Sequence, residues 1–371
     1  MNKIKVCHVV SGLKAGGVES MIYNYCSRMD LSKYEFHILY QHEPSQKNID
    51  EFSKLGFKFG KLPYKIKHPL KNYFETKKYF KKNKIDVVHC HMTLMNIFPL
   101  LAARRCNISK RICHSHNSDV RKKKFLIKIF ENLLKFLCIK NSTHLIACGI
   151  DAGNYMFGRK KFQVLNNAMD LDLYKFNLES RKKIRNTYNI KTNDVLIGHI
   201  GRFTEQKNHR RLIELFEEII NRSDDKSYKL MLLGDGEMKS DIEDIVHEKK
   251  LEEKVIFTGI VSNTNEFYSA FDLFLLPSLW EGLPVVSIES QISGLKCAYS
   301  KNIDMNCKIL NTTNFIDNED TEKWVNFVIF CDINYDRKCD EKLFDNKNLN
   351  IKTEVKKLKQ IYEGGALNGE N

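Results

Sequence analysis

The sequence predicts an α/β fold with two Rossmann-like domains that face each other across a cleft. Short apolar runs alternate with helical stretches, a pattern typical of parallel sheets built from βαβ units. The alternation occurs twice, and a polar, poorly periodic segment near 167–190 separates the two series. At 371 residues the chain is also too long for one core of ordinary size.

The first series of strands lies in residues 1–170. Its apolar runs are 4–10, 35–40, 86–92, 144–148 and 162–165, with helices between them, for example over 18–29 and 70–83. The N-terminal run is short and leads into glycines, which is typical of a first strand and not of a signal peptide. We therefore assign residues 1–170 to an N-terminal domain.

The second series of strands lies in residues 171–350, which we assign to a C-terminal domain. Its apolar runs are 194–201, 228–234, 254–259, 272–278 and 297–300. A last helix is expected over about 351–363, followed by the glycine-rich sequence GGALNGEN. Residues 351–371 are thus expected to form a C-terminal helix and a loose tail.

The charge is distributed unevenly. Residues 1–170 hold 31 Lys+Arg and 12 Asp+Glu, a net of +19, whereas the remainder holds 29 and 34, a net of −5. A basic half suggests an anionic partner, although a lysine-rich composition that serves solubility is the alternative. Eleven cysteines without a CxxC pair suggest a reducing cytosol, and no apolar run is long enough for a transmembrane helix.

Two loops follow the first strands of the two series. In doubly wound sheets, ligands bind beyond the carboxyl ends of the strands. SGLKAGGVES carries Gly16 and Gly17 at the start of a helix, and GRFTEQKNH carries Arg202 and Lys207. Two cations at this edge suit a diphosphate. Taken alone, however, a glycine turn before a helix is more often structural, and the loop with Arg202 and Lys207 could equally be surface charge.

The stretch LPSLWEGLPVVSIESQISG at 276–294 carries more information. It predicts a strand and then a helix, with Leu283 near the N-cap, Pro284 near the first helical position and Gly294 at the end. The helix N-terminus would attract an anion, and the carboxylates of Glu281 and Glu289 would accept hydrogen bonds from vicinal hydroxyls. A sugar, a diphosphate and a ribose would satisfy these groups. The alternative is an ordinary helix with a dipole-stabilising Glu281 and a surface Glu289.

Glu281 and Glu289 form an E-x7-E pattern, and this stretch resembles the donor loop of retaining, GT-B-fold glycosyltransferases of family 4. That family includes enzymes of capsule, exopolysaccharide and lipopolysaccharide assembly. Similar motifs occur along most of the chain in the family's order: VVSGLKAGGVES, RICHSHNS, VLNNAMDLDLYKF, IGRFTEQKNH, LMLLGDGEMK and VIFTGIVSNTNEFYSAFDLFLLPS. Asn167 replaces a usual glycine, and the proline usually found after Gly294 is absent.

The resemblance implies a hexosyltransferase-type enzyme that moves a sugar from a nucleotide-diphosphate sugar, expected to be a UDP-sugar, with retention of configuration. The acceptor would be a glycan or an undecaprenyl-linked glycan in cell-surface polysaccharide synthesis. Four residues are implied in catalysis: Glu281, His116, Arg202 and Lys207. Donor binding is implied for Gly16, Gly17, Arg202, Lys207, Ile260, Val261, Glu281, Gly282, Leu283, Pro284, Val285 and Glu289.

No cofactor and no metal ion are expected, because the cations and the helix N-terminus would neutralise the departing diphosphate. Asp170 and Asp172 mimic a metal-binding Asp-x-Asp motif, but they lie in the linker between the domains. The histidine pairs in HCHM (His89, His91) and HSHN (His114, His116) are spaced for a zinc site. Strands that end at an active cleft account for both pairs without zinc. His116 would face the donor sugar or acceptor, with His114 as second choice and a structural role as the alternative.

The stretch RKKKFLIKIFENLLKFLCIK at 121–140 predicts a basic amphipathic helix. One face carries Leu126, Ile129, Phe130, Leu133 and Leu137, and the other carries Lys124, Lys128 and Lys135. Such helices lie on anionic membranes, so we expect a cytoplasmic protein attached peripherally to the inner face of the plasma membrane. A core helix with a solvated face is the alternative.

Other classes of protein fit the sequence less well. A sugar-nucleotide epimerase on the same two-domain scaffold would need no acceptor. A nucleic-acid-binding protein would need base-stacking aromatic residues among the lysines or a known binding module, and neither is found, so no nucleic acid is expected. A nicotinamide dehydrogenase would need a GxGxxG fingerprint, which the first loop lacks.

Overall fold

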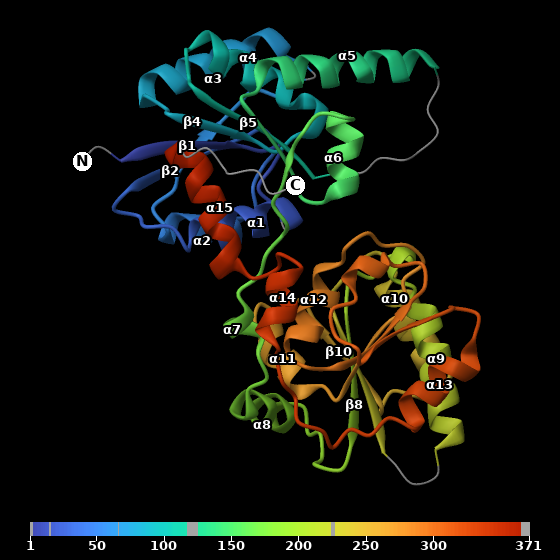
Figure 1. The fold of residues 1–371 in the computed structure, drawn as a ribbon. Coiled ribbons are helices and arrows are strands. Elements are labelled where there is room, and N and C mark those ends of the chain that lie inside the picture. The colour runs from blue at the N-terminus through green and yellow to red at the C-terminus, as the bar shows by residue number, and fades with distance from the viewer. Residues whose placement is uncertain (1–2, 15, 66, 117–124, 224–226, 365–371) are drawn as a thin grey trace. The chain divides into compact units, whose positions relative to one another are not determined.

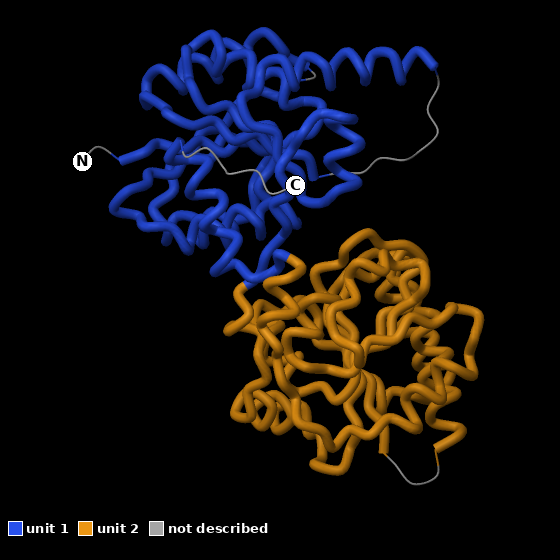
Figure 2. Tube along the Cα trace, in the orientation of Figure 1, with its two compact units in different colours: residues 1–169, 348–371 blue, residues 170–347 orange. Residues whose placement is uncertain are grey.

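The computed structural model describes residues 3–14, 16–65, 67–116, 125–223 and 227–364. The chain divides into two compact units, which Figure 2 colours separately. The first unit comprises Met1–Met169 and Asn348–Asn371, and the second comprises Asp170–Lys347. The C-terminal segment joins the first unit because its backbone pairs there: Met169 N donates to Leu349 O at 2.8 Å, and Ile351 N donates to Met169 O at 2.9 Å.

Among its described residues, the first unit holds one seven-stranded parallel sheet of order β3-β2-β1-β4-β5-β6-β7, with helices on both faces (Figure 1). Its elements are β1 (Ile4–Val9), α1 (Gly17–Cys26), β2 (Tyr34–Tyr40), α2 (Gln46–Lys54), β3 (Lys58–Lys61), α3 (Pro69–Asn83), β4 (Val87–Cys90), η1 (Thr93–Asn96), α4 (Ile97–Arg105), β5 (Lys110–Ser115), α5 (Phe125–Asn141), β6 (His144–Ala147), α6 (Ile150–Phe157), β7 (Gln163–Val164) and α15 (Ile351–Glu363).

The described part of the second unit holds one six-stranded parallel sheet of order β10-β9-β8-β11-β12-β13. Its elements are α7 (Leu171–Tyr174), α8 (Leu178–Thr187), β8 (Val195–Ile200), η2 (Glu205–Lys207), α9 (His209–Arg222), β9 (Tyr228–Leu233), α10 (Lys239–Glu248), β10 (Val255–Gly259), α11 (Thr264–Ala270), β11 (Leu273–Leu276), α12 (Val285–Ile292), β12 (Lys296–Ser300), η3 (Met305–Cys307), β13 (Thr313–Ile316), α13 (Thr321–Ile329) and α14 (Glu341–Asn346).

Neighbouring parallel strands bring distant residues together. β8 pairs with β11, so the loop after β8 and the loop after β11 begin at the same edge of the second sheet. In the first unit, β4 lies between β1 and β5, so the ends of these three strands are adjacent. The predicted α/β class with two Rossmann-like units is therefore confirmed.

Some local predictions differ from the structure. The donor-loop helix α12 begins at Val285, and Pro284 is its N-cap with extended backbone angles (φ −70°, ψ 128°), one residue before the first helical position near which it was predicted. Ser293 caps its C-terminus, and Gly294 follows with a φ of +69°, a conformation that favours glycine. The residues 121–124 of the predicted basic helix, and the predicted tail from residue 365 onward, lie outside the described residues.

No helix in the described ranges is both long and apolar enough to span a membrane. All eleven cysteines are free, and most of them are buried.

Candidate active site

Glu281 lies in the loop between β11 and α12 and is ion-paired. Lys207, at the end of η2, donates from Nζ to Glu281 Oε1 at 2.5 Å, and the hydroxyl of Ser278 donates to the same oxygen at 2.7 Å. The side chains of Lys207 and Glu281 are only 14% and 9% exposed. Both contacts fall on Oε1, so among the described residues no polar contact is seen for Oε2.

Glu289 lies inside α12 and is 7% exposed. Its Oε2 accepts a hydrogen bond from the hydroxyl of Tyr268 at 2.7 Å, and Tyr174 also bonds to the carboxylate. Burial raises the pKa of Glu289, whereas the two tyrosine hydroxyls lower it by a smaller amount. Glu289 is therefore not a surface residue of an ordinary helix, as the alternative interpretation assumed.

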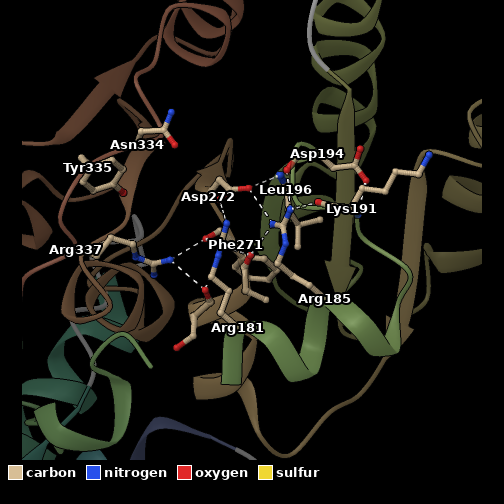
Figure 3. A network of polar contacts seen from close by, with 12 residues as sticks. Arg181, Arg185, Lys191, Asp194, Leu196, Phe271, Asp272, Asn334, Tyr335 and Arg337 are labelled. Carbon is tan, nitrogen blue, oxygen red and sulfur yellow. Dashed lines mark hydrogen bonds and ion pairs between the residues drawn. The ribbon is translucent and has the colours of Figure 1, made fainter. Parts of the chain in front are cut away.

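A network of arginines holds the end of α11, the helix that carries Tyr268 (Figure 3). Arg181 and Arg185, both on α8, donate to Asp272 at 2.6 and 3.1 Å and also to backbone carbonyls at the end of α11. Arg337 donates to the carbonyl of Tyr268 at 2.8 Å and to the hydroxyl of Ser293, the C-cap of α12, at 2.6 Å. Arg337 thus ties together the two helices whose side chains meet at Glu289.

Arg202 differs from Lys207 in its surroundings. Its side chain is 74% exposed and ion-paired to Glu237 at 3.5 Å. The loop that carries it lies tightly against the turn after β9, because a Cβ at Gly234 would come within 2.0 Å of the Gly201 carbonyl oxygen. The structure therefore brings Lys207, but not Arg202, into direct contact with Glu281.

Two further segments of the second unit were predicted to bind the donor: 260–261 and 282–285. Ile260 follows β10 and is 79% exposed, whereas Val261 is partly buried against the core. A Cβ at Gly282 would meet no atom within 4 Å. Leu283 is 37% exposed, and it precedes Pro284, whose place at the N-cap leaves Val285 as the first helical residue. Ile260, Gly282 and Leu283 are thus exposed within the second unit, whereas Pro284 is buried.

In the first unit, Gly16 and Gly17 stand at the start of α1, with Gly16 as its extended N-cap. A Cβ at Gly16 would lie 2.7 Å from a carboxylate oxygen of Glu19, and a Cβ at Gly17 would lie 3.6 Å from the Asn167 amide. Asn167, the residue that replaces a glycine of the family pattern, therefore packs beside this loop.

The predicted histidine pairs converge at the ends of β4 and β5. His91 Nδ1 lies 2.9 Å from His116 Nε2, and His89 Nε2 lies 3.1 Å from His114 Nδ1. His116 is half-buried at the entrance of the group, and burial lowers its pKa to about 4, so its imidazole is neutral near pH 7. His8 from β1 joins the cluster, with Nδ1 3.0 Å from His91 Nε2.

Two other predictions can be compared with the side chains. Lys128 is exposed, but Lys135 is only 17% exposed, ion-paired to Glu131 at 3.2 Å and 3.7 Å above the Tyr155 ring. The prediction that Lys135 lies on the solvent-facing basic side was therefore wrong, because these groups turn it toward the protein. Lys124 lies outside the described residues. In the linker, Asp172 is ion-paired to Lys175 at 2.6 Å, and Asp170 is the N-cap of α7.

Sequence reasoning missed several residues of this site. Tyr268 and Tyr174 lie 21 and 115 positions from Glu289; both stand in quoted family motifs, but neither received a role. Ser278 stood in the quoted donor loop but received no role. His8, the fifth histidine of the cluster, was visible in the sequence KVCHVV, and its place on the first strand was the available signal.

The chain has two α/β units, each with a parallel sheet, and the second unit carries the ion pair and the buried carboxylate after β8 and β11. These features define a glycosyltransferase of the GT-B class. Two family profiles match: the one described as Glycosyltransferase Family 4 covers residues 15–173, and the one described as Glycosyl transferases group 1 covers residues 180–329. The chain belongs to this glycosyltransferase family, as the sequence motifs suggested.

Similar proteins support this assignment. The chain is 34% identical over 312 residues to the "Putative glycosyltransferase EpsF" of Bacillus subtilis, covering 81% of this chain and 79% of that protein. It is 25% identical over 313 residues to an Escherichia coli protein named UDP-Gal:alpha-D-GlcNAc-diphosphoundecaprenol alpha-1,3-galactosyltransferase, covering 79% of each. The solved structure of Anabaena Alr3699/HepE in complex with UDP and glucose has the same fold, with a TM-score of 0.72, 14% identity and coverage of 97% and 100%.

Proposed function

We propose that this glycosyltransferase moves a hexose from a UDP-sugar, with retention of configuration and without a metal ion, to an undecaprenyl-linked or other glycan in cell-surface polysaccharide synthesis. The observation that carries the proposal is the Lys207–Glu281 pair in front of α12, with Glu289 buried inside the same helix. The names of the E. coli relative and of the Anabaena structure support a UDP-sugar donor, and the former supports a lipid-linked acceptor.

Each charged group has a part in donor binding that its geometry allows. The ammonium group of Lys207 has three N–H donors, of which Glu281 uses one, so the others can reach diphosphate oxygens. Oε2 of Glu281 can accept from a sugar hydroxyl while Oε1 stays with Lys207 and Ser278. Glu289 would accept from the ribose hydroxyls, and the N-terminus of α12 adds favourable charge for the phosphates.

Charge grows on the diphosphate as the sugar departs. Lys207 is largely shielded from water, and a cation in such surroundings stabilises developing negative charge more strongly than an exposed one. The attack would occur on the face from which the diphosphate leaves, through an oxocarbenium-like species. Lys207 therefore does the work for which other transferases use a divalent cation, and the exposed Arg202 assists from the rim of the loop.

The donor is tested by incubating the protein with UDP-, GDP- and ADP-sugars and measuring nucleotide release, with and without EDTA. We expect release from a UDP-sugar that EDTA does not lower, and a glycan product whose anomeric configuration by NMR matches the donor. Release only from GDP- or ADP-sugars would overturn the choice of donor, an inverted product would overturn retention, and loss of release in EDTA would overturn metal independence. Product formed without any acceptor, in the form of an altered sugar nucleotide, would favour the epimerase.

We also propose that the first unit binds the anionic inner face of the plasma membrane through α5, which extends outward from this unit in Figure 1. Six apolar side chains on its first three turns are 51–77% exposed: Phe125, Leu126, Ile127, Ile129, Phe130 and Leu133. The exposed Lys128 and Lys140 flank them. An exposed apolar face bordered by cations fits the boundary between acyl chains and anionic headgroups, where a lipid-linked acceptor would be held.

The membrane proposal is tested with the triple variant Leu126→Ser, Phe130→Ser and Leu133→Ser. Burying one such side chain contributes roughly 1.5–3 kcal/mol, so binding to phosphatidylglycerol-containing vesicles should fall by at least about a hundredfold. The matched control is Leu70→Ser with Phe74→Ser on α3, which are 73% and 61% exposed. Equal co-sedimentation of the triple variant and the wild type would show that α5 is only a solvated surface.

A further inference from the structure

Five histidines of the first unit meet at the carboxyl edge of its sheet. His8 lies on β1, His89 lies beside it on β4, and His114 lies on the next strand, β5. His91 and His116 follow the ends of β4 and β5. The alternation of side chains along a strand places His89 with His91, and His114 with His116, on one face. The sequence showed two separate pairs, whereas the sheet order makes them one cluster.

Three of these imidazoles form a group at the end of the cluster nearest to solvent. One ring nitrogen from each of His91, His114 and His116 lies within 4.8 Å of the other two, and His91 Nδ1 and His116 Nε2 are 2.9 Å apart. Two imidazole nitrogens that share a tetrahedral zinc ion lie about 3.3 Å apart, because each Zn–N bond is about 2.0–2.1 Å long. The three rings therefore need only small rotations to hold one ion.

The other two histidines, His8 and His89, contact this group of three from its buried side and orient its rings. His91 uses its other nitrogen, Nε2, for a contact of 3.0 Å with His8, which in turn lies 3.5 Å from the Cys26 sulfur. His114 uses Nδ1 for a contact of 3.1 Å with His89, which in turn contacts the Tyr362 hydroxyl at 2.8 Å. A metal-bound imidazole must donate its remaining N–H, and here both chains end at an acceptor.

One polar atom of this group has no protein partner in the described structure. His114 is completely buried, and its Nε2 has no hydrogen-bond partner among the described residues. A buried polar atom without a partner is unfavourable, and such an atom points to a missing ligand. The ionisable groups that interact with His91 and His114 are other histidines. These neighbouring histidines carry no fixed positive charge that would repel a cation.

We propose that His91, His114 and His116 form a binding site for one late first-row divalent cation such as Zn²⁺, held by three imidazole nitrogens. Neutral imidazole is the form that ligates zinc, and each of the three rings offers one nitrogen to the shared position. The half-buried His116 is the ligand nearest to solvent, so the ion enters there and keeps a water molecule as its fourth ligand.

The site would regulate the enzyme rather than supply its chemistry. A cation bound to His116 withholds that imidazole from the substrate, so Zn²⁺ should inhibit sugar transfer, and a chelator should restore it. This consequence rests on the proposed function, in which His116 faces the donor sugar or the acceptor. Binding of the cation itself does not, and it can be measured without any sugar nucleotide.

Binding is tested by adding Zn²⁺ or Co²⁺ to EDTA-treated, dialysed protein, with calorimetry for Zn²⁺ and visible absorption for Co²⁺. We expect one equivalent per chain and the intense absorption of four-coordinate Co²⁺. His116→Asn should abolish the Co²⁺ band. His8→Asn, which removes only an orienting contact, should weaken binding by about 10- to 100-fold. His144→Asn is the matched control, a partly exposed histidine of the same unit outside the cluster, and should bind like wild type.

Thermal unfolding of each variant shows whether it is folded, and His116→Asn changes a residue that is not fully buried. If the wild type takes up no stoichiometric Zn²⁺, the five histidines form only a hydrogen-bonded chain, and the proposal is wrong. If His116→Asn binds as tightly as wild type, the metal lies elsewhere, and the assignment is equally wrong. Nucleotide release from a sugar nucleotide by the metal-free enzyme, measured separately, reports on the proposed function alone.

Discussion

Replacing Glu289 by Gln separates the part of this carboxylate in donor binding from its effect on the fold. The side chain is 7% exposed and is held by the hydroxyls of Tyr268 and Tyr174. Glutamine keeps the shape and one acceptor oxygen but removes the charge. A hydrogen bond to a charged group contributes about 1.5–3 kcal/mol, so the Michaelis constant for the donor should rise by roughly 10- to 100-fold.

The same substitution should not destabilise the fold at neutral pH. Burial raises the pKa of Glu289 above its ordinary value of 4.5, so between pH 4.5 and the raised pKa the folded state binds more protons than the unfolded state. The free energy of unfolding of the wild type therefore falls as the pH rises through this window. Glu289→Gln lacks this loss, so its melting temperature relative to wild type should be higher at pH 8 than at pH 4.5.

Two assays on the same protein check this expectation: thermal unfolding at both pH values, and nucleotide release as a function of donor concentration. Glu322→Gln, on the exposed face of α13, is the control and should change neither. An unchanged Michaelis constant would remove Glu289 from the donor site. A melting temperature that falls more at pH 8 than at pH 4.5 would show that the tyrosine contacts, and not burial, dominate the energetics of the carboxylate.

The cations of the site give three further expectations. Lys207→Met should lower turnover by about 10²–10³, because the negative charge that Lys207 stabilises grows toward the transition state. The donor affinity, measured by calorimetry, should change much less. A loss of donor affinity without a loss of turnover would refute this role of Lys207. Arg202→Ala should lower turnover less than about tenfold, since its side chain is 74% exposed and screened by water; a loss as large as that of Lys207→Met would show that Arg202 turns onto the phosphates. Steady-state activity should not fall in EDTA, and its abolition would bring Asp170 and Asp172 back as metal ligands.

Most of the fold could be predicted from the sequence because buried parallel strands appear as apolar runs. Three strands were not recognised as runs. β3 is the sequence KFGK, with exposed lysines at both ends, and β13 is TNFI, which has one exposed asparagine. β5 begins with Lys110 and Arg111, and its histidine was noticed only through a motif. Edge and partly exposed strands are stabilised by pairing with neighbours, which a single sequence does not display.

The site was predictable only where its residues are close in sequence. The E-x7-E spacing placed Glu281 and Glu289 on the same loop and helix. The ion pair of Glu281 with Lys207 spans 74 residues, and the contact of His8 with His91 spans 83. Such contacts depend on strand order. The direction of Lys135 was mispredicted because helical periodicity gives the angle around the axis but not which neighbour, here Glu131 and Tyr155, faces each side.

The two acidic residues of the E-x7-E pattern are alike in sequence but differ in electrostatic support. Glu281 has a cation, Lys207, at 2.5 Å, and so its charge is balanced when no donor is bound. Glu289 has two tyrosine hydroxyls and no ion-pair partner among the described residues, and its pKa is raised by burial. A buried carboxylate without an ion-pair partner gains more binding free energy from two ribose hydroxyls than does a carboxylate that a lysine already neutralises. We therefore propose that Glu289 contributes most of the donor affinity, whereas the Lys207–Glu281 pair, already formed, holds the sugar in position as charge passes to the diphosphate.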